Sequence, residues 1–430
     1  MIKKLVVVIL SFGTICLLLL LCFPHKIVLN IGIFAGSNWD VPSGDSYKVI
    51  DQAIETFEAK NPLVEIEYVS GILKDDYSNW LSSLYLQGKE PDVFMVLNED
   101  FNTLSSLGAL QDLSEFIDND HTFNSGDFYK SALEAGKYQG NQYALPYESN
   151  PTLMFVNKTL LGNENIALPD NSWTLDEFYQ ICKQVTKDTD GDGQIDQYGC
   201  YDFDWLDSIY SHNVELFNSD GTECYLNQES VKNAITFITK LNELNQGHTV
   251  TSIEFDEGKV AFSPMPFSQY RTYKPYPWRV KKYSQFEWDC VKMPGVATSS
   301  QSEVSSLLMG ISSRTSYSQT AWEFLKMLTY DQETQQNLFQ YSQGISSLKS
   351  VMSSSETLAL LNEEILGDTK VDLSLLNEVM ENTVGQDRFK KYTSALNLMD
   401  TEIQNIIRDN EDIDLSLMDL QKEINKYLEE

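Results

Sequence analysis

The sequence is poor in the residues from which most catalytic and metal centres are built. It contains four histidines among 430 residues, and no two of them stand at the spacing of metal ligands. None of its six cysteines forms a Cys-x-x-Cys pair. It also lacks a nucleophile elbow, a His-Glu-x-x-His helix and a glycine-rich phosphate loop. The sequence therefore offers no specific support for catalysis, although its many acidic residues could form glycosidase-like carboxylate pairs by chance.

Basic residues are scarce as well. The chain has 31 Lys and Arg against 63 Asp and Glu, which gives a formal net charge of −32. Phosphate binding needs clustered basic side chains, so nucleic acid and anionic lipid are unfavourable partners. With 42% hydrophobic residues the chain can bury ordinary globular cores. Because it is too long for a single core, we expect two or more lobes.

A long apolar run is present at the N-terminus. Residues 5–23 are uncharged and largely apolar, and two lysines precede them. The run is long for a signal peptide and about the length that spans a bilayer. The lysines favour a cytoplasmic N-terminus, which puts the rest of the chain outside the cell membrane. Two alternatives stay open: a retained membrane anchor, or a lipoprotein signal with Cys16 or Cys22 as the lipidated residue.

The segment that follows has the alternating pattern of an α/β lobe. The predicted strands cover residues 27–34, 64–69 and 91–96, and the predicted helices between them cover 46–59 and 77–86. This β-α-β-α-β order predicts a parallel sheet with helices on its faces. Ligands bind beyond the carboxyl ends of such strands, which here means residues 36–40 and 97–100.

The alternation continues toward the C-terminus. An extended segment covers residues 143–156, and helices are predicted over 175–185, 228–244, 320–328 and 333–341. A long helical tail is predicted over 373–428. Residues 272–288, rich in Tyr, Trp, Pro and Lys, predict an exposed irregular segment.

An acidic loop at residues 188–199 resembles the EF-hand calcium pattern. Gly193 stands at the sixth position, where the loop turns sharply, but Gly199 replaces the bidentate glutamate of the twelfth position. The candidate metal ligands are Asp188, Asp190, Asp192, Gln194 and Asp196. Losing the glutamate predicts a weak Kd of about 10⁻⁴–10⁻³ M for Ca²⁺. The alternative is a solvated acidic turn, and a structural Ca²⁺ ion is the one cofactor that the sequence suggests.

Cys182 and Cys200 flank this loop. They could form a disulfide in an exported protein, or they could remain buried free thiols.

Eight short motifs, in order and spacing, resemble one protein family. The motifs lie at residues 89–95, 107–113, 144–150, 154–160, 172–178, 258–262, 288–294 and 321–328. Among them are Lys-Glu-Pro-Asp-Val-Phe-Met, Ala-Leu-Pro-Tyr-Glu-Ser-Asn and Ala-Trp-Glu-Phe-Leu-Lys-Met-Leu. Together they resemble the family-1 extracellular solute-binding proteins of ABC importers, the maltose-binding-protein-like sugar binders. The resemblance covers about residues 27 to 350.

The resemblance implies a two-lobed, periplasmic-binding-protein-like fold of type II. Each lobe would be a mostly parallel sheet flanked by helices, with the ligand in the interlobe cleft. Residues 1–26 would form the signal or anchor. The first lobe would comprise residues 27–145 and 306–345, and the second 146–305 and 346–430. A crossover is expected near residues 145–151, a second near 305–313 and a third just after 344–347.

Candidate binding residues follow the predicted strand ends, because sugars are held by stacked aromatic rings and paired polar groups. The first strand is followed by Asn38, Trp39 and Asp40, and the third by Asn98, Glu99 and Asp100. The alternatives are that the polar residues cap helices and that Trp39 packs in the core.

The resemblance adds further candidates at the crossover and in the second lobe. They are Tyr147, Glu148, Trp205, Asp207, Phe267, Tyr270, Arg271 and Trp278. For each aromatic residue, plain packing is the alternative, and for Trp278 we favour it.

The resemblance implies a membrane-attached, extracytoplasmic binding protein that captures a carbohydrate and delivers it to an ABC permease. We expect a monomer that is not an enzyme and binds no nucleic acid. Two alternatives stay open: a ligand sensor of the same fold that reports to a membrane receptor, and a carbohydrate-active enzyme.

Overall fold

The computed structural model describes residues 26–41, 45, 47–273, 286–296, 300–364 and 371–430. The apolar run at residues 5–23 lies outside the described residues, as does Trp278. Within the described ranges, no helix combines the length and the apolar character that a membrane span requires.

One mixed sheet runs through the molecule. Its strands lie in the order β2-β1-β3-β10-β6-β8-β7, with β11 beside β10, β9 beside β6, and β4 and β5 forming a separate hairpin. The strands are β1 (Ile27–Gly32), β2 (Val64–Tyr68), β3 (Val93–Val96), β4 (Lys137–Tyr138), β5 (Asn141–Gln142), β6 (Ala144–Asn157), β7 (Tyr198–Cys200), β8 (Val260–Pro266), β9 (Trp288–Val291), β10 (Ser302–Ile311) and β11 (Thr383–Val384).

Helices cover the faces of this sheet. They are α2 (Lys48–Lys60), α3 (Lys74–Gln87), α4 (Asn98–Ser106), α5 (Ser114–Asn119), α6 (Lys130–Glu134), α7 (Lys158–Asn163), α8 (Leu175–Val185), α9 (Trp205–Ser211), α10 (Glu229–Glu243), α11 (Ser252–Asp256), α12 (Phe267–Tyr273), α14 (Ser318–Thr329), α15 (Gln332–Tyr341), α16 (Lys349–Met352), α17 (Ser355–Glu364), α18 (Leu373–Glu381), α19 (Tyr392–Asp409) and α20 (Ile413–Glu429), with a short 3₁₀ turn at Ser125–Asp127. Capping residues in the sequence determine where several of these helices begin. At α8, for example, Thr174 and Glu177 form a reciprocal capping box.

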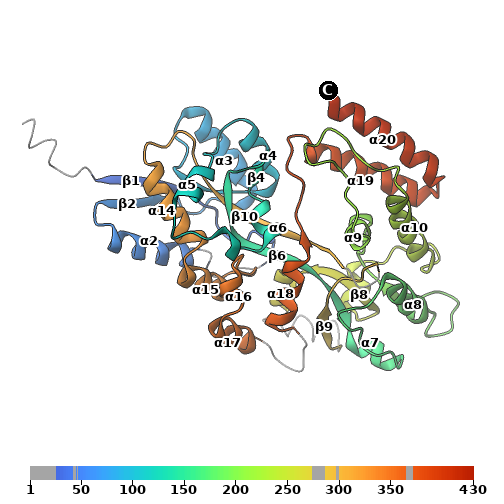
Figure 1. Cartoon of the computed structure of the whole chain (residues 1–430). Coiled ribbons are helices and arrows are strands. Elements are labelled where there is room, and N and C mark those ends of the chain that lie inside the picture. The colour runs from blue at the N-terminus through green and yellow to red at the C-terminus, as the bar shows by residue number, and fades with distance from the viewer. Residues whose placement is uncertain (1–25, 42–44, 46, 274–285, 297–299, 365–370) are drawn as a thin grey trace, which may run out of the picture.

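The hydrophobic residues gather in two main bodies. The core of the first lobe draws on residues 29–147 and 307–351 and lies under α2, α3 and α14. The second lobe has two adjoining cores, formed mainly by residues between 153 and 428. Figure 1 shows the blue first lobe on one side and the green and red second lobe on the other, with β6 and β10 running between them.

The long strands β6 and β10 connect the lobes because each contributes to both. Leu145 of β6 packs in the first core, whereas Met154 and Val156 pack in a second-lobe core. The two strands pair antiparallel, and β10 also pairs antiparallel with β3. Parallel pairing occurs within the lobes, between β1 and both β2 and β3, and between β7 and β8. The sheet is therefore mixed where the chain crosses between the lobes.

Most predicted elements are confirmed within a few residues. These include the first three strands, the two helices between them, the extended segment at β6, and the helices α8, α10, α14 and α15. The predicted irregular segment 272–288 is wrong at both ends, because Thr272 belongs to α12 and Trp288 begins β9; residues 274–285 lie outside the described residues.

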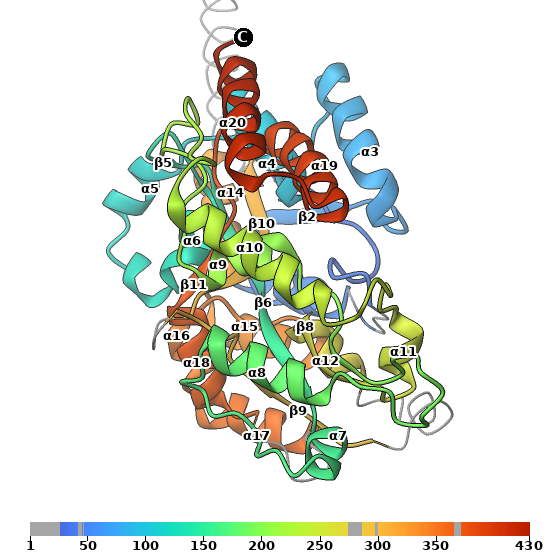
Figure 2. The same ribbon diagram turned by 90° about the vertical axis from the view of Figure 1, so that its right-hand side faces the viewer.

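The single long helical tail over 373–428 is also wrong. It breaks into α18, α19 and α20 for two reasons. Thr383 and Val384 pair in parallel with β10 instead of continuing the helix. Asn410 adopts the left-handed conformation (φ 51°), which ends α19. The helices α19 and α20 then fold back on each other beside α10, as Figure 2 shows.

Candidate functional site

A pocket opens where the end of β1 meets β6, β10 and the end of α15. It has an empty volume of about 410 Å³, part of which is open to solvent. Its lining includes Ser37, Asn38, Asp45, Tyr147, Glu148 and Tyr341. Three predicted binding residues, Asn38, Tyr147 and Glu148, therefore share one concave site at the carboxyl end of a parallel strand. Its polar groups are amide, hydroxyl and carboxylate, which suit hydroxylated ligands.

Glu148 is the most constrained polar group of this pocket. It is only 3% exposed and accepts hydrogen bonds from the Ser342 hydroxyl and from the Gly344 N–H, the latter at 2.5 Å. Burial raises its pKa, and these hydrogen bonds act in the opposite direction. The buried Trp39 indole N–H faces the same carboxylate but makes no hydrogen bond of normal geometry.

Arg271 holds the same turn from the second lobe. It is 5% exposed and donates to three main-chain carbonyls, those of Phe339 (2.8 Å), Ser342 (2.7 Å) and Gly344 (2.9 Å). The turn at residues 339–344 is thus bound by Glu148 of β6 on one side and by α12 on the other. In this structure the arginine acts on the connection between the lobes.

The loop after β1 is fixed by a lysine. Lys74 Nζ donates to the Asn38 carbonyl (2.7 Å) and pairs with the Asp40 carboxylate (3.0 Å). Asp40 has a φ of 54° and does not cap α2, whose N-cap residue is Tyr47. Trp39 is half-buried and packs against the first core. The loop therefore presents Asn38 at the pocket, places the Trp39 side chain near Glu148 and ties Asp40 to the start of α3.

The residues after β3 form the first turn of α4, and their side chains do not cap that helix. Asn98 Oδ1 accepts a hydrogen bond from Arg388 Nη2 at 2.7 Å. Asp100 accepts from the Ser78 hydroxyl at 2.5 Å, and burial raises its pKa. Glu99 is exposed. Of the three, Asn98 is the one that faces the second lobe.

The predicted aromatic contacts of the second lobe lie within its packing. Trp205 is 3% exposed and its indole N–H donates to Asp400 at 2.8 Å. Phe267 and Tyr270 are buried and stack with ring centroids 5.8 Å apart. In the described conformation these rings have no face open to solvent, so their role in ligand binding stays a prediction.

Acidic side chains gather at the start of α9. Asp204 and Asp207 form a reciprocal capping box, and burial raises the pKa of both, that of Asp207 strongly. The charge of Glu303 on β10 contributes to the shift at Asp207. Asp204 itself is exposed. Sequence reasoning found Asp207 but missed Asp204, Glu303, Ser342 and Arg388; only Asp204 carried a local signal, the Asp-x-x-Asp spacing.

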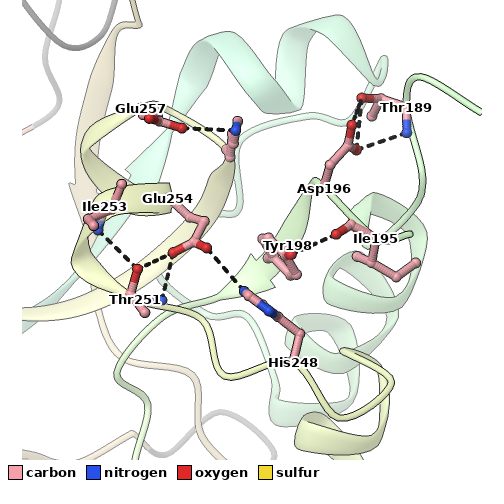
Figure 3. A network of polar contacts seen from close by, with 10 residues as sticks. Thr189, Ile195, Asp196, Tyr198, His248, Thr251, Ile253, Glu254 and Glu257 are labelled. Carbon is pink, nitrogen blue, oxygen red and sulfur yellow. Dashed lines mark hydrogen bonds and ion pairs between the residues drawn. The ribbon is translucent and has the colours of Figure 1, made fainter. Parts of the chain in front are cut away.

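The acidic loop holds three of the five predicted metal ligands together. Carboxylate oxygens of Asp188, Asp190 and Asp196 lie within 4.8 Å of one another. Asp188 accepts the N–H groups of Gly191 (2.6 Å) and Gly193 (2.7 Å), which lower its pKa. Figure 3 shows Asp196 turned toward Thr189, whose backbone N–H and hydroxyl both donate to it. The hard oxygen donors of this cluster fit Ca²⁺; Asp192 is not among the grouped carboxylates, and the role of Gln194 stays a prediction.

The loop leads into a polar network around β7. Tyr198 donates to the Ile195 carbonyl (2.7 Å) and stacks on His248, which contacts Glu254 at 3.1 Å (Figure 3). Burial opposes ionisation of Glu254, but hydrogen bonds from Thr251 and neighbours lower its pKa to about 2. This network joins the end of the acidic loop to α11.

Packing explains why the twelfth loop position carries no glutamate. A Cβ placed on Gly199 would lie 2.4 Å from the Cβ of Cys182. No side chain fits there, so a bidentate ligand is excluded at that position. Cys182, Cys200 and Cys224 are free buried thiols in this structure.

Comparison with known proteins identifies the family. The sequence model of the bacterial extracellular solute-binding proteins matches residues 52–359, well over half of the chain. The chain belongs to this family. A maltotriose-binding protein of Pyrococcus abyssi is 25% identical over 141 residues, a match that spans 33% of this chain and 30% of that relative.

Solved structures of solute-binding proteins share the fold. The cyclic α-maltosyl-1,6-maltose binding protein of Arthrobacter globiformis matches with a TM-score of 0.77 and 15% identity, covering 94% of this chain and 99% of its own. The sugar-binding protein MalE of Xanthomonas citri matches with a TM-score of 0.76 and 14% identity, covering 93% and 97%. A Listeria monocytogenes ABC substrate-binding protein in complex with cycloalternan matches with a TM-score of 0.69 and 19% identity. The match covers 94% of this chain and 99% of that protein. The predicted two-lobed α/β fold is confirmed.

Proposed function

We propose that this solute-binding protein captures a carbohydrate between its lobes and delivers it to an ABC permease. The observation that carries the proposal is the pocket at the end of β1, which Asn38, Tyr147 and Glu148 line, with the Trp39 indole close to the Glu148 carboxyl. Rings and planar polar groups together are what a pyranose needs, since its faces are apolar and its edge carries hydroxyls.

The charge of the pocket supports an uncharged ligand over an anionic one. Its described lining includes the carboxylates of Asp45 and Glu148 and no lysine or arginine. Arg271 lies close by, but its guanidinium donates to the carbonyls of the 339–344 turn. A phosphorylated or carboxylated solute would lie beside these two carboxylates, whereas sugar hydroxyls can donate to both.

Binding would act through the lobe crossovers. Contacts that a ligand makes only when both lobes surround it shift the open–closed equilibrium toward the closed form. Glu148 and Arg271 both hold the 339–344 turn, so they are suited to transmit a contact in the pocket to the connection between the lobes. The permease would then recognise the closed shape.

Attachment to the cell and metal binding belong to the same proposal. The apolar run at residues 5–23 would hold the protein at the extracytoplasmic face of the membrane, either as a retained anchor or as a lipoprotein signal. Asp188, Asp190 and Asp196 would hold a structural Ca²⁺ ion, which would supply only charge neutralisation and loop order. We propose a monomeric binding protein without catalytic activity.

A thermal-shift screen tests the function. A ligand that binds only the folded state raises the melting temperature, by an amount that grows with the logarithm of its concentration relative to Kd. We expect a shift with at least one mono- or oligosaccharide, loss of that shift in Trp39→Ala, and its retention in the control Tyr317→Ala, an exposed ring that does not line the pocket. Recovery of the sugar unmodified would separate binding from catalysis. A shift with a non-carbohydrate solute alone would contradict the proposal.

A further inference from the structure

The segment that joins α18 to α19 passes between the two lobes, as Figure 1 shows. It is fastened to the second lobe at both ends. Thr383 and Val384 pair with Ser302 and Glu303 of β10. Phe389 is 6% exposed and packs in a second-lobe core.

From this base, Arg388 reaches the first lobe. Its Nη2 donates to Asn98 Oδ1 at 2.7 Å, and its guanidinium lies 5.0 Å from the centroid of the Phe101 ring. The amide of Asn102 donates to the carbonyl of Asp387 at 3.4 Å. All three partners belong to α4. One short segment of the second lobe therefore contacts a single helix of the first lobe through Asp387 and Arg388.

This contact is not explained by the stability of the fold. The Nε and Nη1 atoms of Arg388 are buried without a hydrogen-bond partner among the described residues. Burial lowers the pKa of the guanidinium to about 10, although the negative charge of Asp387 acts to raise it. A buried cation with unsatisfied donors costs stability. The arginine instead forms a charge-assisted hydrogen bond to Asn98, which links the second lobe to the first.

We propose that Arg388 is an interlobe latch that holds α4 against the second lobe and biases the ligand-free protein toward the described arrangement. The inference rests on the proposed function only in that the lobes move relative to each other. One hydrogen bond to a charged group corresponds to a shift of about tenfold or more in the ratio of the described arrangement to arrangements in which the lobes lie further apart.

The test measures the distance between the lobes without any ligand. Spin labels at Ser82 on α3 and Thr401 on α19, both exposed, would report the interlobe distance by pulsed dipolar spectroscopy. Arg388→Met keeps the aliphatic stem over Phe101 but removes every donor. Arg408→Met is the matched control, because Arg408 is exposed on α19 and its hydrogen-bond partners are its neighbours Asp409 and Asn405.

We expect a longer and broader distance distribution in Arg388→Met, with a melting temperature that is unchanged or raised, and no change in Arg408→Met. Asn98→Ala removes the acceptor from the first lobe and should give the same broadening, with no further effect in the double variant. It also keeps the test valid if Arg388→Met does not fold. Distributions identical to the wild type in Arg388→Met or Asn98→Ala would overturn the latch. Because no ligand is present, failure of the protein to bind sugars leaves this result unaffected.

Discussion

The prediction that we develop furthest concerns Glu148, because it joins the pocket to the crossover between the lobes. Replacing it with alanine leaves the Gly344 N–H without its acceptor in a buried turn. The Ser342 hydroxyl also loses its acceptor, but Ser342 is half-buried and can turn to water. Glu148→Gln is the matched control, since an amide oxygen can accept the same hydrogen bonds without a charge.

An orphaned buried N–H costs about 1–3 kcal/mol. Part of this loss is offset, because burial raises the pKa of the wild-type carboxyl and its charge is therefore destabilising in the fold. At pH 7 we expect Glu148→Ala to lower the free energy of unfolding by about 1–2 kcal/mol, and Glu148→Gln, which keeps an acceptor and removes the charge, to leave it unchanged or raise it.

The pH dependence has a defined sign. A carboxyl whose folded pKa lies above its ordinary value of 4.5 contributes stability below that pH and loses it as the pH rises through the folded pKa. The stability of Glu148→Gln relative to wild type should therefore increase from pH 4.5 upward. Urea unfolding at several pH values measures both effects. Equal stability of Glu148→Ala and wild type at pH 7 would refute the role of the carboxylate in holding the turn.

Three further predictions follow from the packing and the charges. Gly199→Ala should destabilise the fold by about 1–3 kcal/mol, because the added Cβ would lie 2.4 Å from the Cβ of Cys182. The control Gly162→Ala, whose Cβ would have open space around it, should not destabilise the fold; similar urea midpoints for the two variants would contradict this packing. At 10 mM Ca²⁺, a Kd of 10⁻⁴–10⁻³ M predicts about 1.4–2.7 kcal/mol of added stability. The melting temperature should therefore be higher with Ca²⁺ than with chelator, and Asp188→Asn should abolish the difference. Identical melting curves for the wild type in both conditions would exclude a bound Ca²⁺ ion. Asp387 has its pKa raised by burial from 3.8 to about 6, so wild type should lose stability relative to Asp387→Asn as the pH rises from about 4 to 6; parallel melting curves over that range would refute the shift.

The sequence predicted the fold well because hydrophobic periodicity and strand-helix alternation are local properties. The strand over residues 91–96 and the helix over 175–185 needed no tertiary information, and the eight motifs located the crossover at β6. The prediction of one long helix for the tail was wrong because the break depends on Thr383 and Val384 pairing with β10, a contact between residues 81 positions apart that no local pattern encodes.

The site was predictable only in part, for the same reason. Asn38 and Tyr147 follow a strand end and a crossover, which sequence reasoning can locate. Ser342, Glu303 and Arg388 gain their importance from where the folded chain carries them, and Arg388 reaches Asn98 across 290 positions. Trp205 shows the converse, since a tryptophan at a promising position packs against Asp400 in the second lobe.

The central claim is that one carbohydrate molecule binds between the lobes. Titration calorimetry of the protein with mono- and oligosaccharides, followed by recovery of the ligand, tests it most directly. We predict saturable binding of at least one sugar at one molecule per chain, with heat lost in Trp39→Ala and the sugar recovered unchanged. Absence of saturable heat with every sugar, together with stoichiometric binding of a non-carbohydrate solute, would contradict it.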